Sequence, residues 1–447
     1  MIKRGRIAFG FLCLIALGAV LLASPFAQSA GRWGRFGEAF FTAFSAVCVT
    51  GLSVVDIASE YTLAGQWVLL ALVEIGCLGL MTCGTFLLIA VGRRLSLASE
   101  FSLMNASGVR QVRGLKGLIL WTVGSMLTFE LIGAALYYSR LRTMFPVHAL
   151  YYSCFYSVMS FCNAGFSILP GSLAGFADDP FLVLVSAFLT IVGGIGFLVV
   201  FNLCTFRFLR LLNGARGRLS LHTKTVLRFT FMLLVIAFAV FLAAEWNHSL
   251  VEFPFWKKLW VGFYQAVTPR TCGFCIVPTE DLQPVTRLFY DFLMFVGGGP
   301  GSAAAGMKVT TFAVLIYTLT AMCRGETETV MSGKVIPSDI VREAFVIFMA
   351  LAAFALTTAG ALLVTESGAI AAGKVAADSL FFESVSAVTT TGLSVGSTTA
   401  SLSFSGRVVI LVAMFIGRLG ALTVVLIIGD RESKKHIRFP TEEIVVG

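Results

Sequence analysis

The stretch that decides the fold is FFTAFSAVCVTGLSV at 40–54, because it returns 341 residues later as FFESVSAVTTTGLSV at 381–395. Ten of the fifteen positions are identical, so the two stretches are copies of one element. Such a stretch is too polar to cross a membrane and too apolar for an exposed loop, which is typical of a re-entrant pore helix.

Two more diverged copies lie between these, CFYSVMSFCNAGFS at 154–167 and GFYQAVTPRTCGF at 262–274. All four copies keep a phenylalanine ten residues before a glycine. The pairs are Phe41/Gly51, Phe155/Gly165, Phe263/Gly273 and Phe382/Gly392. The glycines recur at intervals of 114, 108 and 119 residues, which predicts four copies of helix, re-entrant helix, glycine loop and helix.

The composition indicates a membrane protein. Of the 447 residues, 57% are hydrophobic and 13% are charged, and the mean hydropathy is +0.89, which excludes a water-soluble globule and a disordered chain. The predicted spans lie near 7–25, 64–92, 117–138, 181–206, 226–245, 285–322, 343–364 and 407–429. Between the two spans of each pair lies one semi-polar segment: 37–56, 149–169, 257–276 and 377–397.

These segments predict an all-α integral membrane protein with four pseudo-repeats around one central pore. The expected repeats are 1–95, 96–215, 216–335 and 336–447, the last with a C-terminal tail. Lys and Arg exceed Asp and Glu in the segments that would face the cytoplasm, but not in the others, so both termini are expected to be cytoplasmic. The net charge of +9 therefore reflects membrane orientation, and no nucleic-acid partner is expected.

The N-terminal segment has a second interpretation. Lys3, Arg4 and Arg6 precede an apolar run that ends in Ala27-Gln28-Ser29-Ala30, as in a signal peptide with its cleavage site. Cleavage would remove the first helix of the first repeat, which the other three repeats all keep. A retained first span is therefore the favoured interpretation.

Four glycine loops at membrane depth must line a water-filled path, because unpaired backbone is not tolerated in hydrocarbon. Glycine permits the backbone conformations that turn successive carbonyl groups inward, and a ring of carbonyl oxygens replaces the hydration shell of a monovalent cation. The alternative, in which each glycine relieves a tight helix crossing, explains one loop but not four at the same offset from a phenylalanine.

The loops Cys48-Val49-Thr50-Gly51-Leu52, Phe161-Cys162-Asn163-Ala164-Gly165-Phe166-Ser167, Thr268-Pro269-Arg270-Thr271-Cys272-Gly273-Phe274 and Thr389-Thr390-Thr391-Gly392-Leu393 resemble those of the Trk/Ktr/HKT superfamily of potassium transporters. The resemblance covers almost the whole chain and is greatest to KtrB-type subunits of bacterial Ktr systems. It implies that potassium is bound by backbone carbonyls at and just before each glycine. The implied filter residues are Val49, Thr50, Gly51, Asn163, Ala164, Gly165, Thr271, Cys272, Gly273, Thr390, Thr391 and Gly392.

A glycine-rich run interrupts the span 285–322. The run is Gly297, Gly298, Gly299, Pro300, Gly301, Ser302, Ala303, Ala304, Ala305 and Gly306. With five glycines and a proline it predicts a broken helix, and irregular backbone within a membrane must face a cavity. A flexible loop below the filter is therefore predicted to be a gate, the role that the resemblance also implies.

Charged residues lie in or near the spans. Arg418 is expected to face the pore or a carboxylate, and the resemblance implies that it pairs with the gate. Lys308 has two equal interpretations, a charge in the cavity or a snorkelling side chain. Arg270 is expected to brace its own loop. No motif assigns roles to Glu74, Glu130 and Asp291, for which satisfied interhelical contacts are expected.

The predicted function is passive potassium uptake across the bacterial inner membrane by a channel subunit, not an enzyme. The resemblance implies a homodimer and a cytoplasmic nucleotide-binding RCK-type partner like KtrA. The apolar end of 439–447 is predicted to be buried at the dimer interface. The alternative is a TrkH-like or alternating-access cation symporter, disfavoured because only one predicted span is broken and the repeats share one topology. Besides potassium as the transported ion, no cofactor is expected. Sodium activation, sodium or proton coupling, and the activating nucleotide stay open.

Overall fold

The computed structural model describes residues 2–90, 114–213 and 219–420 and is helical through most of that length. The prediction of an all-α fold is confirmed. The longer helices are α1 (Ile2–Ala23), α4 (Leu63–Ala90), α6 (Gly114–Met144), α8 (Pro180–Ile195), α9 (Phe197–Asn213), α10 (Leu221–Glu245), α12 (Pro284–Phe295), α13 (Val309–Cys323), α14 (Ser338–Thr365) and α18 (Phe404–Leu419).

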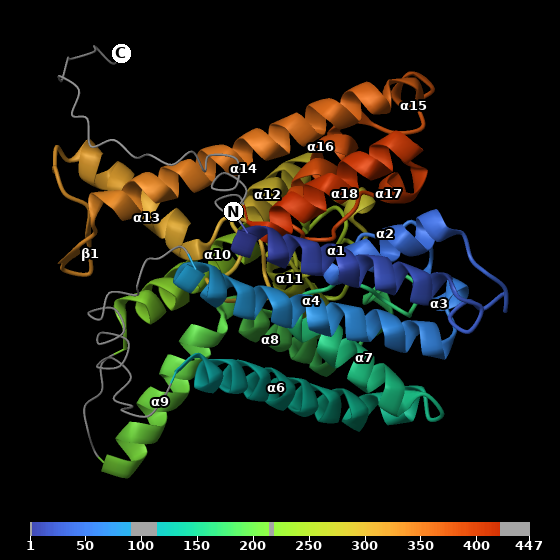
Figure 1. Ribbon diagram of the computed structural model, residues 1–447, viewed down its shortest axis with the longest axis horizontal. Helices are drawn as coiled ribbons and strands as arrows, with labels where there is room; N and C mark the ends of the chain where they lie inside the picture. Colours follow the sequence, from blue (N-terminus) through green and yellow to red (C-terminus); the bar gives the residue numbers. More distant parts are fainter. Residues whose placement is uncertain (1, 91–113, 214–218, 421–447) are drawn as a thin grey trace.

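Four short helices occupy the semi-polar segments: α2 (Phe36–Val47), α7 (Ala149–Phe161), α11 (Phe255–Val267) and α16 (Ala377–Val388). Most of their residues are buried, since each is enclosed by longer helices (Figure 1). Minor turns complete the fold: α3 (Ile57–Glu60), η1 (Ala174–Phe176), η2 (Thr279–Asp281), α15 (Ser367–Ala371) and α17 (Thr398–Ser401).

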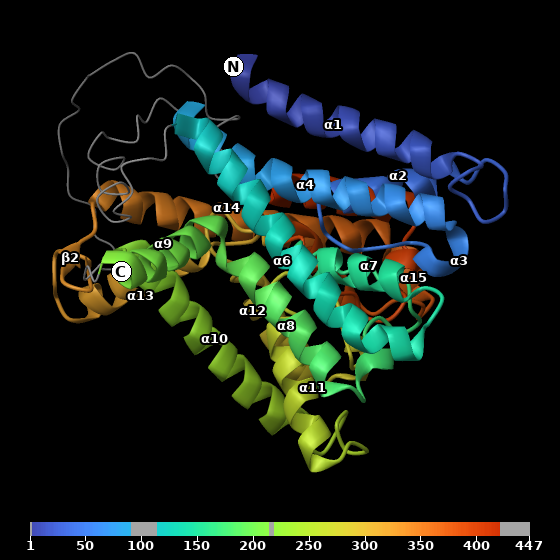
Figure 2. The same ribbon diagram turned by 90° about the horizontal axis from the view of Figure 1, so that it is seen from below.

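The helices are arranged as a closed ring. Each short helix packs against the long helix that precedes it: α2 on α1, α7 on α6, α11 on α10 and α16 on α14. Each also contacts a long helix from the adjoining group: α4 lies on α7, α8 on α11, α12 on α16, and α18 returns to α2. Figure 2 shows α1 and α4 on the opposite side of this arrangement from α10 and α11. The repeat boundaries themselves stay a prediction.

The expected span 181–206 is not one straight helix. α8 and α9 meet at a bend of 96°, and α9 turns away from the bundle at the lower left of Figure 1. The bend lies at Gly196, whose φ of 97° interrupts helical geometry. The Pro300 carbonyl oxygen fills the space where a Cβ would be, and the Phe197 amide donates to the Gly301 carbonyl at 3.1 Å. The prediction that only one span is broken is therefore wrong.

The predicted break within 285–322 is present between α12 and α13. Its two ends lie side by side, because Val296 and Met307 form a parallel bridge and the Gly297 amide donates to the Met307 carbonyl at 2.8 Å. The loop between them packs on the end of α8, where the Gly299 amide donates to the Gly194 carbonyl at 2.8 Å. The two broken helices thus meet at their breaks.

A small hairpin between α13 and α14 was missed by sequence reasoning. Strands β1 (Val330–Met331) and β2 (Lys334–Val335) pair antiparallel across Ser332 and Gly333. Both turn residues have positive φ, 51° and 74°, as the two-residue turns of hairpins require. The signal was a Ser-Gly pair between short apolar stretches. In Figure 1 the hairpin lies at the opposite end of the molecule from α15.

By length and composition, three of the described helices can cross a membrane, or four when the bent pair counts as one span. They are Leu120–Met144, Leu221–Glu245 and Ser338–Thr365, together with Pro180–Ile195 joined to Phe197–Thr205. Apolar helical stretches of 10–17 residues also lie in other predicted spans, among them Phe9–Ala23 within α1 and Val309–Cys323. The predicted interface segment 439–447 lies outside the described residues.

Candidate functional site

Each short helix ends in a glycine loop with the same backbone pattern. The glycine and the residue two positions before it both have positive φ. The angles are 51° and 92° for Val49 and Gly51, 55° and 70° for Asn163 and Gly165, 68° and 81° for Thr271 and Gly273, and 48° and 85° for Thr390 and Gly392. The residue between them does not share the positive φ, and alternating signs of φ turn neighbouring carbonyl groups toward one side. Because non-glycine residues rarely adopt this conformation, it marks a constrained site.

The four glycines form a ring in which each faces the loop that follows it along the chain. A Cβ on Gly51 would overlap the Ala164 carbonyl oxygen, and one on Gly165 would lie 3.0 Å from the Cys272 oxygen. In the same way a Cβ on Gly273 would lie 2.8 Å from the Thr391 oxygen, and one on Gly392 would overlap the Thr50 oxygen, which closes the ring. The glycines are thus required by close packing as well as by their φ.

Polar side chains with no protein partner surround this ring. Thr50, Asn163, Thr271 and Thr390, one from each loop, are 0–1% exposed, and none of their side-chain oxygen atoms has a hydrogen-bond partner in the described part of the chain. Buried polar atoms are normally paired, so one unpaired side chain in each of the four loops indicates partners that the protein does not supply, such as water or a ligand. Oxygen atoms are the ligands that hard cations prefer.

The local sequence explains why the loops take this shape. In the first and fourth loops, the amides of Gly51 and Gly392 donate to the hydroxyls of Ser45 and Ser386, both at 3.1 Å. The amide before each glycine donates to the same serine's carbonyl, at 2.8 Å in both loops. This serine belongs to the Ser-Ala-Val triplet that the two copies share, so the sequence identity preserves a turn.

Glycines in the second long helix of three groups were missed by sequence reasoning. Gly76, Gly193 and Gly417 each lie against the last helical carbonyl of a short helix, those of Val47, Phe161 and Val388. A Cβ at any of them would overlap that oxygen. Small residues let helices approach closely in membranes, so these glycines fix how closely each long helix packs on the end of its short helix. Their similar offsets from the loop glycine, 25 residues for Gly76 and Gly417 and 28 for Gly193, were the available signal.

Three cationic side chains bind carbonyl oxygens of the glycine-rich run. Arg418, only 2% exposed, donates through Nη1 to Ala303 at 3.0 Å and through Nη2 to Gly76 at 3.2 Å. The Lys308 ammonium donates to the Ala304 carbonyl at 2.5 Å, and both interpretations of this lysine, a charge in the cavity or a snorkelling side chain, stay predictions. These contacts tie the run to α4 and α18.

Arg270 provides the third contact. Its Nη2 donates to the Gly297 carbonyl at 3.2 Å, so this arginine reaches out of the third glycine loop to the first residue of the run. This hydrogen bond fits the expectation that Arg270 braces its loop, and the acceptor lies outside that loop. The glycine run lies only a few residues beyond α12, and the turn at Thr268 to Arg270 points the side chain toward it.

Glu74, Glu130 and Cys162 form a cluster behind the second loop. Their ligand atoms all lie within 4.8 Å of one another, and the thiol is 3.7 Å from a Glu130 oxygen and 3.9 Å from a Glu74 oxygen. This is the set in the described residues that could hold a metal ion.

The expected satisfied contacts are not found for Asp291, whose Oδ1 has no partner among the residues that the structure describes.

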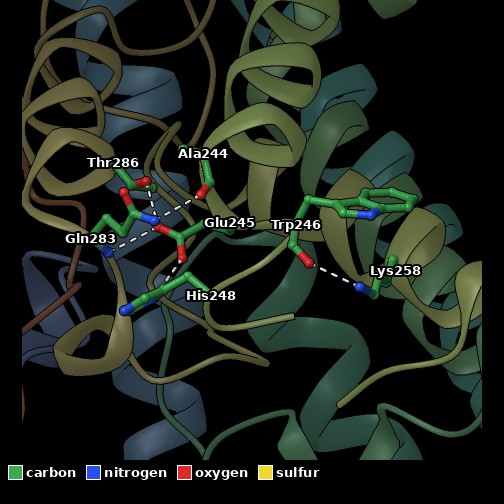
Figure 3. Close-up of polar contacts among 7 residues, drawn as sticks. All are labelled: Ala244, Glu245, Trp246, His248, Lys258, Gln283 and Thr286. Atoms are coloured by element: carbon green, nitrogen blue, oxygen red, sulfur yellow. Dashed lines mark hydrogen bonds and ion pairs between the residues drawn. The ribbon is translucent and has the colours of Figure 1, made fainter. Parts of the chain in front are cut away.

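A buried carboxylate in the third group lies between the end of α10 and the start of α12 (Figure 3). Glu245, the last residue of α10, is 0% exposed, and its Oε1 accepts from the Gln283 amide at 2.9 Å and from the Thr286 hydroxyl. Its Oε2 lies 3.3 Å from His248 Nδ1. The carboxylate thereby joins the end of α10 to the start of α12.

The short helix α11 is fastened at the same place. The Lys258 ammonium donates to the Trp246 carbonyl at 2.8 Å and lies 4.8 Å from the centre of the Trp246 ring (Figure 3). Because Lys258 lies on α11, it holds this helix to the end of α10. Both attachments fix the position of α11, whose C-terminal end leads into the third glycine loop.

Replacement of Glu245 by alanine is expected to lower the free energy of unfolding by about 2–5 kcal/mol, because it leaves the Gln283 amide and the Thr286 hydroxyl unpaired in a buried place. Thermal unfolding in detergent micelles measures the loss. Glu245→Gln keeps the acceptor oxygen and serves as the matched control, with a smaller decrease in Tm. An alanine variant as stable as the parent would contradict a bracing role.

The chain is similar to one family of proteins over most of its length. Residues 22–436 match the family model TrkH, described as a cation transport protein. The chain resembles the solved structure of the potassium transporter TrkH from Vibrio parahaemolyticus with a TM-score of 0.71 and 18% identity, over 94% of this chain and 84% of that one. At this identity the structural likeness supports the fold alone.

Two curated relatives are similar along nearly their whole length. The Ktr system potassium uptake protein B of Bacillus subtilis is 34% identical over 99% of this chain and 96% of its own. The potassium/sodium uptake protein NtpJ of Enterococcus hirae is 32% identical over the same shares. These matches confirm the predicted resemblance and the prediction of a membrane transport protein rather than an enzyme. The chain therefore belongs to the TrkH family of cation transport proteins.

Proposed function

We propose that this chain is the ion-translocating subunit of a potassium uptake system in the bacterial inner membrane. The observation that carries the proposal is the closed ring of glycine loops, with four unpaired polar side chains around it. Potassium would bind carbonyl oxygens within the loops Val49–Gly51, Asn163–Gly165, Thr271–Gly273 and Thr390–Gly392.

Potassium fits this ring better than a smaller ion does. The loops offer neutral oxygen atoms rather than carboxylates, and such ligands favour a large, weakly hydrated monovalent cation. The two curated relatives are named for potassium uptake, one of them also for sodium. Because each loop has one glycine rather than two, the filter is short, and moderate selectivity over sodium is the expected outcome.

The glycine-rich run, 297–306, is proposed as the gate. Arg270, Lys308 and Arg418 place three positive charges around it, each bonded to a run carbonyl and none to a carboxylate among the described residues. Positive charge at this depth repels a permeating cation. Opening would require the run to move. The three cationic side chains would then either move with it or lose their hydrogen bonds to its carbonyls.

A cytoplasmic partner and a homodimer complete the proposal. The described residues of this chain form one membrane unit. The Bacillus subtilis relative is named as a protein of a Ktr system, and we extend that assignment to this chain as part of the proposal. A soluble nucleotide-binding subunit docked on the basic cytoplasmic segments could move the bent α9 and the run that contacts it at Gly196 and Gly301. The contact at the α8–α9 bend would transmit a movement of α9 to the proposed gate.

An alternating-access symporter is the rival function. The bend at Gly196 adds a second broken helix near the first, and broken helices are typical of such transporters. The cyclic order of the helix contacts favours a pore instead, because the four short helices surround one axis. Potassium flux that depends on an imposed sodium or proton gradient would favour the rival.

The direct test is growth of a potassium-uptake-deficient bacterium on low potassium with this chain expressed, with and without a KtrA-type subunit. We expect growth at low potassium with both proteins and weaker growth with the chain alone. Gly360→Ser is a suitable control variant, because a side chain at Gly360 meets no atom within 4 Å. Absence of growth from a chain that reaches the membrane in both conditions would contradict potassium uptake.

A further inference from the structure

Arg270 joins the third glycine loop to the glycine-rich run in an unusual way. It lies three residues before Gly273, is 8% exposed, and donates from Nη2 to the Gly297 carbonyl at 3.2 Å. Its Nε, by contrast, has no hydrogen-bond partner within the described ranges. A buried donor without a partner lowers the stability of the folded protein, so we expect a partner for Nε.

A cavity lies beside this arginine. It offers about 10 Å³ to the centre of a water molecule, close to the room that one buried water needs. Its polar and glycine walls come from Arg270 on the glycine loop, Thr230 on α10, Thr190 and Gly194 on α8, and Gly298 on the run. Three apolar side chains complete the wall: Ile191 of α8, Leu234 of α10 and Val267 of α11. The cavity is therefore where filter loop, run and two long helices meet.

A second unpaired polar atom opens on the same cavity. The hydroxyl of Thr230, a residue 6% exposed, has no partner in the described part of the chain. Across the cavity, Thr190 Oγ1 lies 3.3 Å from the Cys272 thiol and can donate to the Ser160 carbonyl at 3.3 Å. A donor, a hydroxyl and a water-sized space are the elements of a built water site.

We propose that this cavity holds one ordered water between Arg270 Nε and Thr230 Oγ1, and that Arg270 is a positioning residue that couples the filter to the gate. One half of its guanidinium holds the run at Gly297 and the other half holds α10 through the water. The inference rests on the proposed function of the loops and the run, and adds the connection between them.

The planar guanidinium is suited to this double contact. Its fixed fork places donors toward two partners at once, which a lysine ammonium on a flexible stem does not reproduce. In this proposal the movement of the run at opening includes Gly297 and breaks its contact with Arg270, so the third loop is released when the gate opens. Potassium occupancy of the filter and the position of the run are then linked, and such linkage acts in both directions.

Two variants test the coupling. Arg270→Lys keeps the charge but loses Nε, and Thr230→Val removes the hydroxyl while it keeps the shape. Thr225→Val, the same change on the same helix at a residue that does not line the cavity, is the matched control. Each variant is reconstituted with and without the soluble subunit, and potassium flux is measured as a function of potassium concentration.

We expect both cavity variants to change two quantities together, the flux without the soluble subunit and the half-saturating potassium concentration. Arg270→Lys should change each by roughly tenfold, the factor that corresponds to about 1.4 kcal/mol. Thr230→Val should change both in the same direction by less, and should add nothing in the Arg270→Lys background, because the two residues act through one water. Thr225→Val should change neither.

Three results would overturn the inference. One is a change in flux with an unchanged half-saturating concentration, which indicates a gate contact without coupling. Another is additive effects of the two variants. The third is a high-resolution map of the intact protein with no density for water in the cavity. Each can occur while serine variants of the loop glycines still lose selectivity, so failure here is distinct from failure of the proposed filter.

Discussion

Replacement of Gly392 or Gly51 by serine is expected to abolish selective potassium transport. At both positions φ is positive, 85° and 92°, which costs a residue with a side chain about 1–2 kcal/mol. The new Cβ would also overlap a backbone oxygen, that of Thr50 or Ala164, and neither oxygen can move without shifting a neighbouring loop. Because those oxygens are proposed potassium ligands, the apparent affinity should fall by tenfold or more, about 1.4 kcal/mol. Rubidium or potassium uptake at varied sodium measures the effect.

The structure also predicts an order among the four glycines. A Cβ on Gly165 would lie 2.9 Å from the Gly273 Cα, and one on Gly273 would lie 2.8 Å from the Thr391 oxygen, which are smaller overlaps. Serine at these two positions should therefore impair transport less than at Gly51 or Gly392. Gly360→Ser provides the control for insertion and folding. An unchanged preference for potassium over sodium in all four variants would refute the pore assignment.

Deletion of 298–305 is expected to raise potassium flux and to make it independent of the soluble subunit. The flanking residues already lie together: a Cβ on Gly306 would be 3.3 Å from the Gly297 nitrogen, so the shortened chain can close without moving α12 or α13. The deletion removes the carbonyls that hold Arg418 and Lys308 in place. If these contacts account for about 1.4 kcal/mol of the barrier, the flux without the partner rises about tenfold. Flux into proteoliposomes measures it.

Arg418→Ala tests the same idea with a single side chain. It should raise flux in the same direction, because it removes the bonds that join Ala303 of the run to Gly76 of α4. Arg407→Ala, on the same helix near its outer end, is the control, since its side chain bonds only Leu402 and Ala400 among the contacts described. A folded deletion variant that conducts no faster than the parent would show that the run is a flexible break and not the gate.

Much of the architecture could be read from the sequence because it depends on local patterns. The apolar spans, the semi-polar segments and the Phe-to-Gly offset are all short-range features, and α2, α7, α11 and α16 lie where they were expected. The broken helix at the glycine run followed from helix propensity alone. The ring contacts of Gly51 and Gly392 are compatible with that pattern, although the individual filter assignments stay predictions.

The features that were missed depend on tertiary contacts. Gly196 is one glycine among several in an apolar helix, and only the approach of Pro300 and Gly301 explains why the helix bends there. The acceptor for Arg270 was not predicted, because the run to which it donates lies 27 positions further along the chain. Likewise, no local signal brings Glu74 and Glu130 together, since they come from separate helices.

The closure of the ring between its first and last quarters has a consequence for biosynthesis. Gly392 meets the Thr50 carbonyl, and Arg418 bonds Gly76 across 342 positions of sequence. Earlier helices can enter the membrane one after another from the ribosome, but the first loop has no neighbour on one side until the final quarter has been translated. A nascent or truncated chain thus exposes a half-built edge at membrane depth. A chain truncated before Gly392 therefore cannot complete the ring of glycine loops.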